Sequence, residues 1–288
     1  MKTTALVVIL CGLTACVIAP VLGQKESEPD RHGLIDWVIG ADSRPLFEVS
    51  AGLDQPKHKK FAGEFTGLGF AEARLGYSTV RGFRPGIIEL DDRVVYAAYS
   101  SDQLGTFNAT SSSVPLEMWT FGIANRSGFG WDLGPFGLIP FHRHSMELST
   151  VDYSIPQAID PADSAILDRY STSARFGNTT EAGLQLAVSD LIGINLSYQG
   201  QVISPRFVFW EWFGSYILAG IAVKAISDFG EDIVERSPVL GPILYFILRN
   251  GVAFAVYALW RNEVNWPFHS ETPLTRETAR LGVSLAFP

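Results

Sequence analysis

The fold is decided by residues 206–261, which read RFVFWEWFGSYILAGIAVKAISDFGEDIVERSPVLGPILYFILRNGVAFAVYALWR. They hold two apolar runs, Phe207–Phe229 and Val239–Trp260, on either side of a charged link. Each run of about 22 residues is long enough to cross the roughly 30 Å hydrocarbon core of a bilayer as a helix. The stretch therefore predicts a helical hairpin.

Charged side chains interrupt both runs. Glu211 and Lys224 lie in the first run, and Arg249 lies in the middle of the second. Because charges within apolar helices need partners, we expect these three to be buried and paired where the hairpin packs on or inside the rest of the protein. The alternative is a hairpin that spans a membrane by itself.

On both sides of the hairpin the periodicity changes from helical to strand-like. The clearest case is 180–202, where apolar residues alternate with small or polar ones on both sides of a predicted turn at Ser189-Asp190. The alternation also appears within 46–153 and at Ala279–Pro288, and it predicts about eight to ten two-faced strands. Asp91-Asp92 and Asn125–Gly128 are predicted as turns between strands, and Asp160-Pro161 as the start of a short helix.

These strands resemble those of bacterial outer-membrane β-barrel proteins, which are apolar on one face and small or polar on the other. The last strand resembles the terminal strand of such barrels, since it alternates apolar residues and ends in the aromatic Phe287, although Pro288 follows. The resemblance implies a mainly β fold, an antiparallel 8–10-stranded membrane-type barrel over 46–288 with the helical hairpin inserted at about 206–261. A soluble lipocalin-like barrel or β-sandwich, with its apolar face inward, produces the same alternation and stays open as an alternative.

The N-terminal residues predict export. Residues 1–23 have a charged start, an apolar core and small residues after it, as a signal peptide does. Residues 13–16, Leu-Thr-Ala-Cys, resemble the lipobox of bacterial lipoproteins, in which Cys16 would be lipidated. Cleavage between Gly23 and Gln24 by ordinary signal peptidase also fits the sequence. Both cleavage sites stay open. Residues 24–45 are polar and turn-rich, and we interpret them as an N-terminal tether.

Composition excludes some classes of function. The net charge of −8 argues against nucleic-acid binding, which requires lysine and arginine to neutralise phosphates. The basic cluster Lys57–Lys60 is interpreted as a solvated turn rather than a phosphate site. Both cysteines, Cys11 and Cys16, lie in the leader, so we expect a mature chain without a disulfide.

The sequence offers few candidates for chemistry. His142 and His144 lie on one face of a predicted strand and could form half of a zinc site, but no third ligand accompanies them and Glu147 would face the other way. Ser145 next to His144 could seed a hydrolase, yet neighbours on a strand point to opposite faces and could not pair directly. No catalytic, metal or cofactor site is therefore predicted.

The leading prediction is an exported bacterial cell-envelope protein in the outer membrane, with a structural, binding or transport role and no catalysis. Its expected partners are membrane lipids and, through the C-terminal strand, the barrel-assembly machinery. One alternative is a lipid-anchored periplasmic β domain that binds a hydrophobic small molecule. A second alternative, an envelope lipid-modifying enzyme, depends on His142, His144 and Ser145.

Overall fold

The computed structural model describes residues 43–105, 113–154, 159–206, 208–268 and 270–287. The predicted signal peptide, the lipobox with Cys16 and nearly all of the tether therefore lie outside the described residues.

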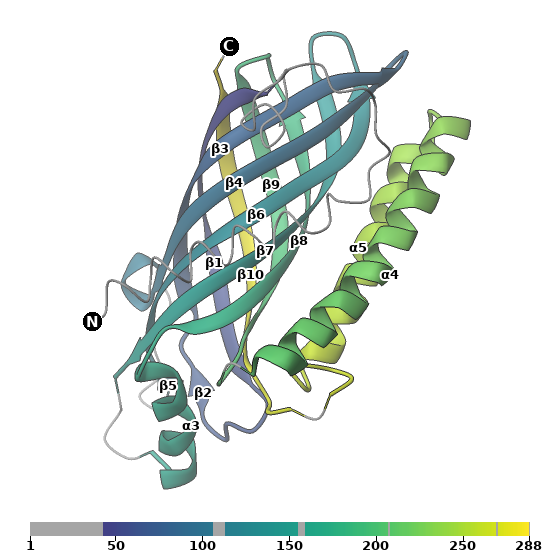
Figure 1. Ribbon diagram of the computed structural model, residues 1–288. Helices are drawn as coiled ribbons and strands as arrows, with labels where there is room; N and C mark the ends of the chain where they lie inside the picture. The colour runs from purple at the N-terminus through teal and green to yellow at the C-terminus, as the bar shows by residue number, and fades with distance from the viewer. Residues whose placement is uncertain (1–42, 106–112, 155–158, 207, 269, 288) are drawn as a thin grey trace, which may run out of the picture. The chain divides into compact units, whose positions relative to one another are not determined.

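Eight long strands form a closed antiparallel barrel (Figure 1). Each pairs with the next along the chain, and β1 closes the ring by pairing with β10. The predicted 8–10-stranded antiparallel barrel is thus confirmed. The barrel strands are β1 (Arg44–His58), β3 (Leu68–Arg84), β4 (Ile87–Ser101), β6 (Leu116–Asp132), β7 (Gly137–Tyr153), β8 (Arg175–Ala187), β9 (Ile192–Ile203) and β10 (Leu274–Ala286).

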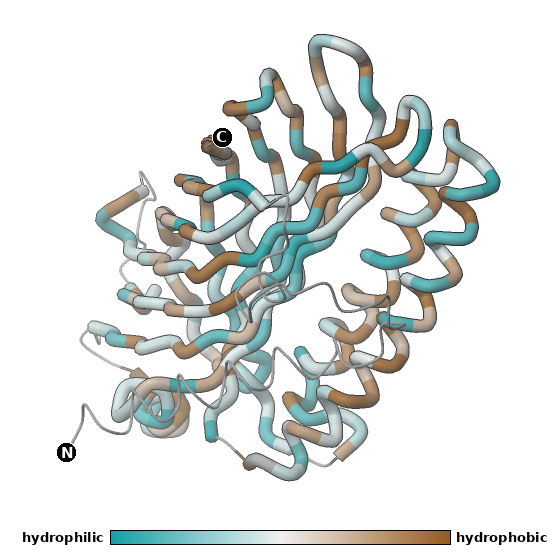
Figure 2. The backbone as a smooth tube through the Cα atoms, turned by 45° about the horizontal axis from the view of Figure 1, so that its top comes forward, coloured by the Kyte–Doolittle hydropathy of each residue, from teal (hydrophilic) through white to brown (hydrophobic). Residues whose placement is uncertain are grey.

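The barrel is apolar outside and polar inside. Hydrophobic and hydrophilic residues alternate along the strands (Figure 2). On β9, Leu196 is 60% exposed, whereas its neighbours Asn195 and Ser197 are only 2% and 6% exposed. Exposed apolar side chains continue around the outer wall at Val49, Leu53, Leu75, Val95, Phe121, Leu184, Leu281 and Val283. A soluble barrel turns its apolar face inward, so this arrangement identifies the membrane type.

The two ends of the barrel differ. The end at which β1 begins and β10 ends, here called the terminal end, has the short connections 85–86, 133–136 and 188–191. Gly86 and Gly134 have φ values of 78° and 85° in two of these turns, a region that side chains with a Cβ rarely adopt. Every long connection lies at the opposite end, here called the loop end. Short turns at one end and long loops at the other are the usual layout of outer-membrane barrels.

The loop end carries small elements and the helical hairpin (Figure 1). β2 (Glu64–Phe65) and β5 (Ser113–Val114) pair in parallel, and a single 3₁₀ turn, η2, covers Asp102–Leu104. Helix α3 (Pro161–Ser171) begins as predicted, with the Asp160 carboxylate accepting from the Ala162 amide at 2.8 Å.

The hairpin lies along the outside of the barrel. Its helices are α4 (Phe209–Arg236) and α5 (Gly241–Trp260); α5 contacts the wall at β6–β9, and α4 packs on α5 (Figure 1). Its tip reaches the terminal end, where the Trp131 indole donates to the carbonyl of Pro238 at 3.3 Å. By length and composition α5 is able to cross a membrane, and its 20 residues span about 30 Å.

Two predicted turns are wrong. Asp91-Asp92 lies inside β4 and Asn125–Gly128 lies inside β6, so both strands continue without a break. Asp92 and Arg126 are direct cross-strand partners, and their side chains form an ion pair of 2.5 Å in the lumen. Asp92 and Arg126 belong to segments that suggest a turn in a soluble protein, but here both side chains lie on the inward face of a strand, because the interior of this barrel is polar.

Candidate functional site

The inward faces of the strands carry a dense set of charges. Five arginines and six carboxylates are almost completely buried there, and we call them the luminal network. Its members are Arg74, Arg126, Arg143, Arg276, Arg280, Glu48, Asp54, Glu72, Asp92, Glu147 and Glu181. Charges taken this far from water are stabilised only by pairing and hydrogen bonding.

Two arginines bridge three carboxylates at the centre of the network. Arg74 places its three nitrogens 2.7 Å from Glu48, 2.5 Å from Glu72 and 3.2 Å from Glu181. Arg280 contacts the same three carboxylates, with 2.7 Å to Glu181. These side chains come from β1, β3, β8 and β10, so the network joins separate parts of the wall across the lumen.

The remaining arginines extend the network along the lumen. Arg143 Nε lies 2.7 Å from Glu181, and its guanidinium lies 4.8 Å from the centre of the Tyr96 ring. Arg276 Nε lies 2.9 Å from Asp54. The lumen is therefore filled by side chains at several levels.

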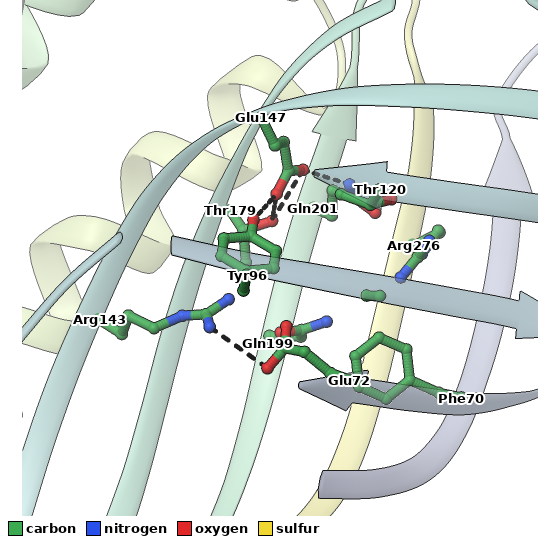
Figure 3. A pocket seen from close by; sticks show the side chains of 11 residues that line it. Phe70, Glu72, Tyr96, Thr120, Arg143, Glu147, Thr179, Gln199, Gln201 and Arg276 are labelled. Atoms are coloured by element: carbon green, nitrogen blue, oxygen red, sulfur yellow. Dashed lines mark hydrogen bonds and ion pairs between the residues drawn. The ribbon is translucent and has the colours of Figure 1, made fainter. Parts of the chain in front are cut away.

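Glu147 is the carboxylate without a direct arginine partner in this network (Figure 3). It accepts hydrogen bonds from Tyr96 and Gln201, from Thr179 Oγ1 at 3.0 Å and from Ser145 Oγ at 3.4 Å. A cavity of about 10 Å³, room for about one water molecule, adjoins it and is lined mostly by polar side chains from several strands. The cavity is too small and too polar for a hydrophobic ligand.

An apolar cap closes the loop end of the barrel. Inward-facing residues at the ends of the strands pack against β2, β5 and α3. Burial raises the pKa of Tyr170, which contributes from α3. The cap consists of Phe65, Leu68, Val114, Leu116, Met118, Val151, Leu167, Tyr170, Ile203 and Leu274.

A polar patch on the outer wall lies beneath the hairpin. His142 and His144 face outward from β7, and Thr180 is the β8 partner of His144. His142 Nδ1 lies 2.9 Å from the Asn250 side-chain oxygen of α5, and the ring of His144 lies 5.7 Å from that of Tyr216 on α4. The hairpin therefore covers polar groups that would otherwise face lipid.

Close packing and hydrogen bonds hold the hairpin against the wall. Gly200 of β9 permits the approach of Tyr257, because a Cβ at this position would lie 2.8 Å from the tyrosine ring. Nearer the terminal end, Phe129 and Tyr245 pack edge to face, with ring centres 4.9 Å apart. Between the helices, Trp260 Nε1 donates to Ser215 Oγ at 2.8 Å.

The three hairpin charges do not pair with one another. Lys224 is exposed and forms an ion pair with Asp228 one turn later, at 3.2 Å. Glu211 is half-buried and accepts from Asn265 at 3.4 Å, while Arg249 is half-buried and bonds to the Tyr245 hydroxyl. Because Lys224 is exposed, the expected burial of all three charges together does not occur.

The candidates for chemistry are divided by the barrel wall. His142 and His144 lie on the outer side, whereas Ser145 and Glu147 face the lumen, so His144 and Ser145 do not meet. Within the described part of the chain, no three His, Cys, Asp or Glu side chains are placed to hold a metal ion.

Reasoning from sequence missed the luminal network. The signal was present in the inward positions of single strands, such as Glu72 and Arg74 two residues apart on β3. Their partners come from distant strands, as for Arg74 and Glu181, which are 107 residues apart. The Gly-rich segment 128–137 forms the end of β6, a turn and the start of β7.

Two solved structures are similar to this chain over most of its length. Neisserial surface protein A matches with a TM-score of 0.37 and 10% identity, covering 84% of this chain and 97% of that chain. Ail, the attachment invasion locus protein of Yersinia pestis, matches with a TM-score of 0.28 and 9% identity, covering 85% of this chain and 99% of that chain. No family model and no curated protein matches. Since both likenesses are remote, the barrel assignment rests on the strand pairing itself.

Proposed function

We propose that this chain is an integral outer-membrane protein of a bacterial cell envelope, with a structural or binding role. The observation that carries the proposal is a closed barrel with an apolar outer wall and a lumen filled by paired charges. An apolar wall of this kind is stable against lipid and unstable against water.

The filled lumen favours a structural or binding role over passive transport. Solutes would have to break ion pairs such as Arg280–Glu181 at 2.7 Å and to pass the apolar cap at the loop end. Leaving one charge of a buried pair without its partner costs about 3–5 kcal/mol. The surfaces that remain for binding are the outer wall, the hairpin and the loop end.

We also propose that β10 is the segment through which the barrel-assembly machinery recognises the chain. Leu281 and Val283 are exposed on its outer face, and β10 pairs with β1 at the closure of the barrel. The amide of Phe287 donates to the carbonyl of Pro45 at 2.9 Å, which extends this pairing by one more hydrogen bond.

The two alternative functions lack a site in the described residues. A periplasmic carrier of a hydrophobic ligand needs an apolar cavity, whereas the cavity beside Glu147 is small and polar. A lipid-modifying enzyme built on His144 and Ser145 needs both side chains on one face. Neither function is proposed.

The proposal is tested by membrane fractionation together with gel mobility before and after boiling. Outer-membrane fractionation with a band that shifts on heating is expected, because a closed barrel resists detergent until it is heated. Release by carbonate or salt washing would contradict the proposal. An open pore would be revealed by steady conductance of the purified protein in planar bilayers, and we expect none.

A further inference from the structure

A cluster of basic side chains forms at the loop end, where the hairpin rejoins the barrel. Lys57 is the last residue but one of β1 and lies 2.7 Å from Glu277 of β10. Lys59 donates to the Asn262 side-chain oxygen at 3.2 Å, and Arg261 lies 3.6 Å from Glu277. The fold thus adds residues from the end of the hairpin to a cluster that the sequence places at 57–60 alone.

The cluster lies at the edge of the apolar outer wall. Toward the loop end, the outward-facing residues of β10 are Leu281, Ala279 and Glu277, in that order. Glu277 is the first charged residue of this series, and it lies about 13 Å along the strand from Leu281. Tyr198, the β9 partner of Ala279, is 45% exposed at the same edge. An exposed aromatic beside the last apolar residues marks the level of lipid headgroups.

The cluster has an excess of positive charge although the whole chain carries −8. Four basic side chains gather there, and each is exposed: Lys57, Lys59, Lys60 and Arg261. Two carboxylates, Glu277 and the neighbouring Glu263, offset part of this charge, which leaves four minus two, or an excess of two. Exposed lysines at a membrane edge extend their ammonium groups toward headgroups while their stems stay on the apolar wall.

We propose that this cluster binds the phosphate of an anionic lipid in the leaflet at the loop end. The inference rests on the proposed function, because it requires the barrel to lie in a bilayer. Its level favours a lipid over a soluble acidic partner, since Lys57 and Arg261 lie beside Glu277 at the edge of the apolar wall and Lys59 and Lys60 lie in the turn that directly follows β1. Lysine suits phosphate as a compact point charge.

The test uses the full chain reconstituted into phosphatidylcholine vesicles that contain a minor fraction of headgroup-labelled phosphatidylglycerol. Energy transfer from the protein's tryptophans to the label measures enrichment of the anionic lipid around the protein. With about 1 kcal/mol for each excess charge, the excess of two predicts roughly 25-fold enrichment at low salt, falling as salt is raised.

The patch variant replaces Lys57, Lys59, Lys60 and Arg261 by glutamine. The control variant replaces four exposed basic residues away from the cluster by glutamine: Arg44, Arg84, Lys224 and Arg236.

We expect the patch variant to lose the enrichment and the control variant to keep it. Equal enrichment in the patch variant and the parent, or equal loss in both variants, would overturn the proposal. Competition by added inorganic phosphate at low concentration would also overturn it, because the site would then take free phosphate rather than lipid. The heat-shifted band is measured on the same samples. Its absence from the parent protein would contradict the proposed function itself, whereas a shifted band without enrichment contradicts only this inference.

Discussion

Replacing Arg280 by methionine tests whether the luminal network supports the barrel. The side chain is 3% exposed and contacts Glu48, Glu72 and Glu181. Its removal leaves six carboxylates facing four arginines in the lumen instead of six facing five. Breaking a buried ion pair by removing one partner costs about 3–5 kcal/mol, because the remaining charge stays buried. The free energy of unfolding should fall by this amount, which lowers the ratio of folded to unfolded protein roughly a hundred- to several-thousand-fold.

The assay is urea-induced unfolding in lipid vesicles, followed by tryptophan fluorescence and by gel mobility. Arg81→Met is the matched control, since Arg81 forms an ion pair of 2.8 Å with Glu89 on the outer surface. Exposed pairs contribute about 0–1 kcal/mol, so this variant should stay close to the parent. The double variant Arg280→Met/Glu181→Leu restores the original excess of one carboxylate and should recover part of the loss. Equal stability of Arg280→Met and Arg81→Met would refute the reasoning.

Three further changes test the outer wall and the hairpin. Leu196→Arg places a charge on the lipid-facing side and should lower the free energy of unfolding in vesicles by about 2–4 kcal/mol; no loss would contradict a lipid-facing Leu196. Gly200→Leu should displace Tyr257, so that protease cleaves the hairpin while the heat-shifted band persists; a resistant hairpin would argue against close docking. Asn250→Leu leaves His142 buried without its partner and should cost about 1–3 kcal/mol in the same urea assay, whereas an unchanged midpoint would show that the contact is not needed.

The barrel was predictable because its strands alternate with a period of two. Leu196 between Asn195 and Ser197 shows this pattern directly, and the sequence also placed the helical hairpin. The direction of the apolar face was not predictable, since an outward face in lipid and an inward face in water leave the same alternation. The long inserted hairpin favoured a membrane but did not decide the matter.

The interior was not predictable, because it depends on pairing between distant strands. Asp92 and Arg126 suggested turns while each was considered in its own segment, and only the register of β4 with β6 makes them partners. The position of Lys224 on the exposed side of α4 depends in the same way on how α4 packs against α5. Local pattern specifies a strand or a helix, whereas the packing of elements decides which side is buried.

The central claim is that the apolar face of the strands contacts lipid and the polar face lines a closed lumen. It is tested most directly by placing single nitroxide labels at successive positions 192–199 on β9, in a chain whose Cys11 and Cys16 are replaced by alanine. Collision rates with oxygen, which concentrates in lipid, are compared with those of a water-soluble nickel complex. We expect oxygen collisions to peak at 192, 194, 196 and 198, with low collision rates for both reagents at the positions between them. High nickel accessibility at 194 and 196 would contradict the claim, because these side chains would then face water.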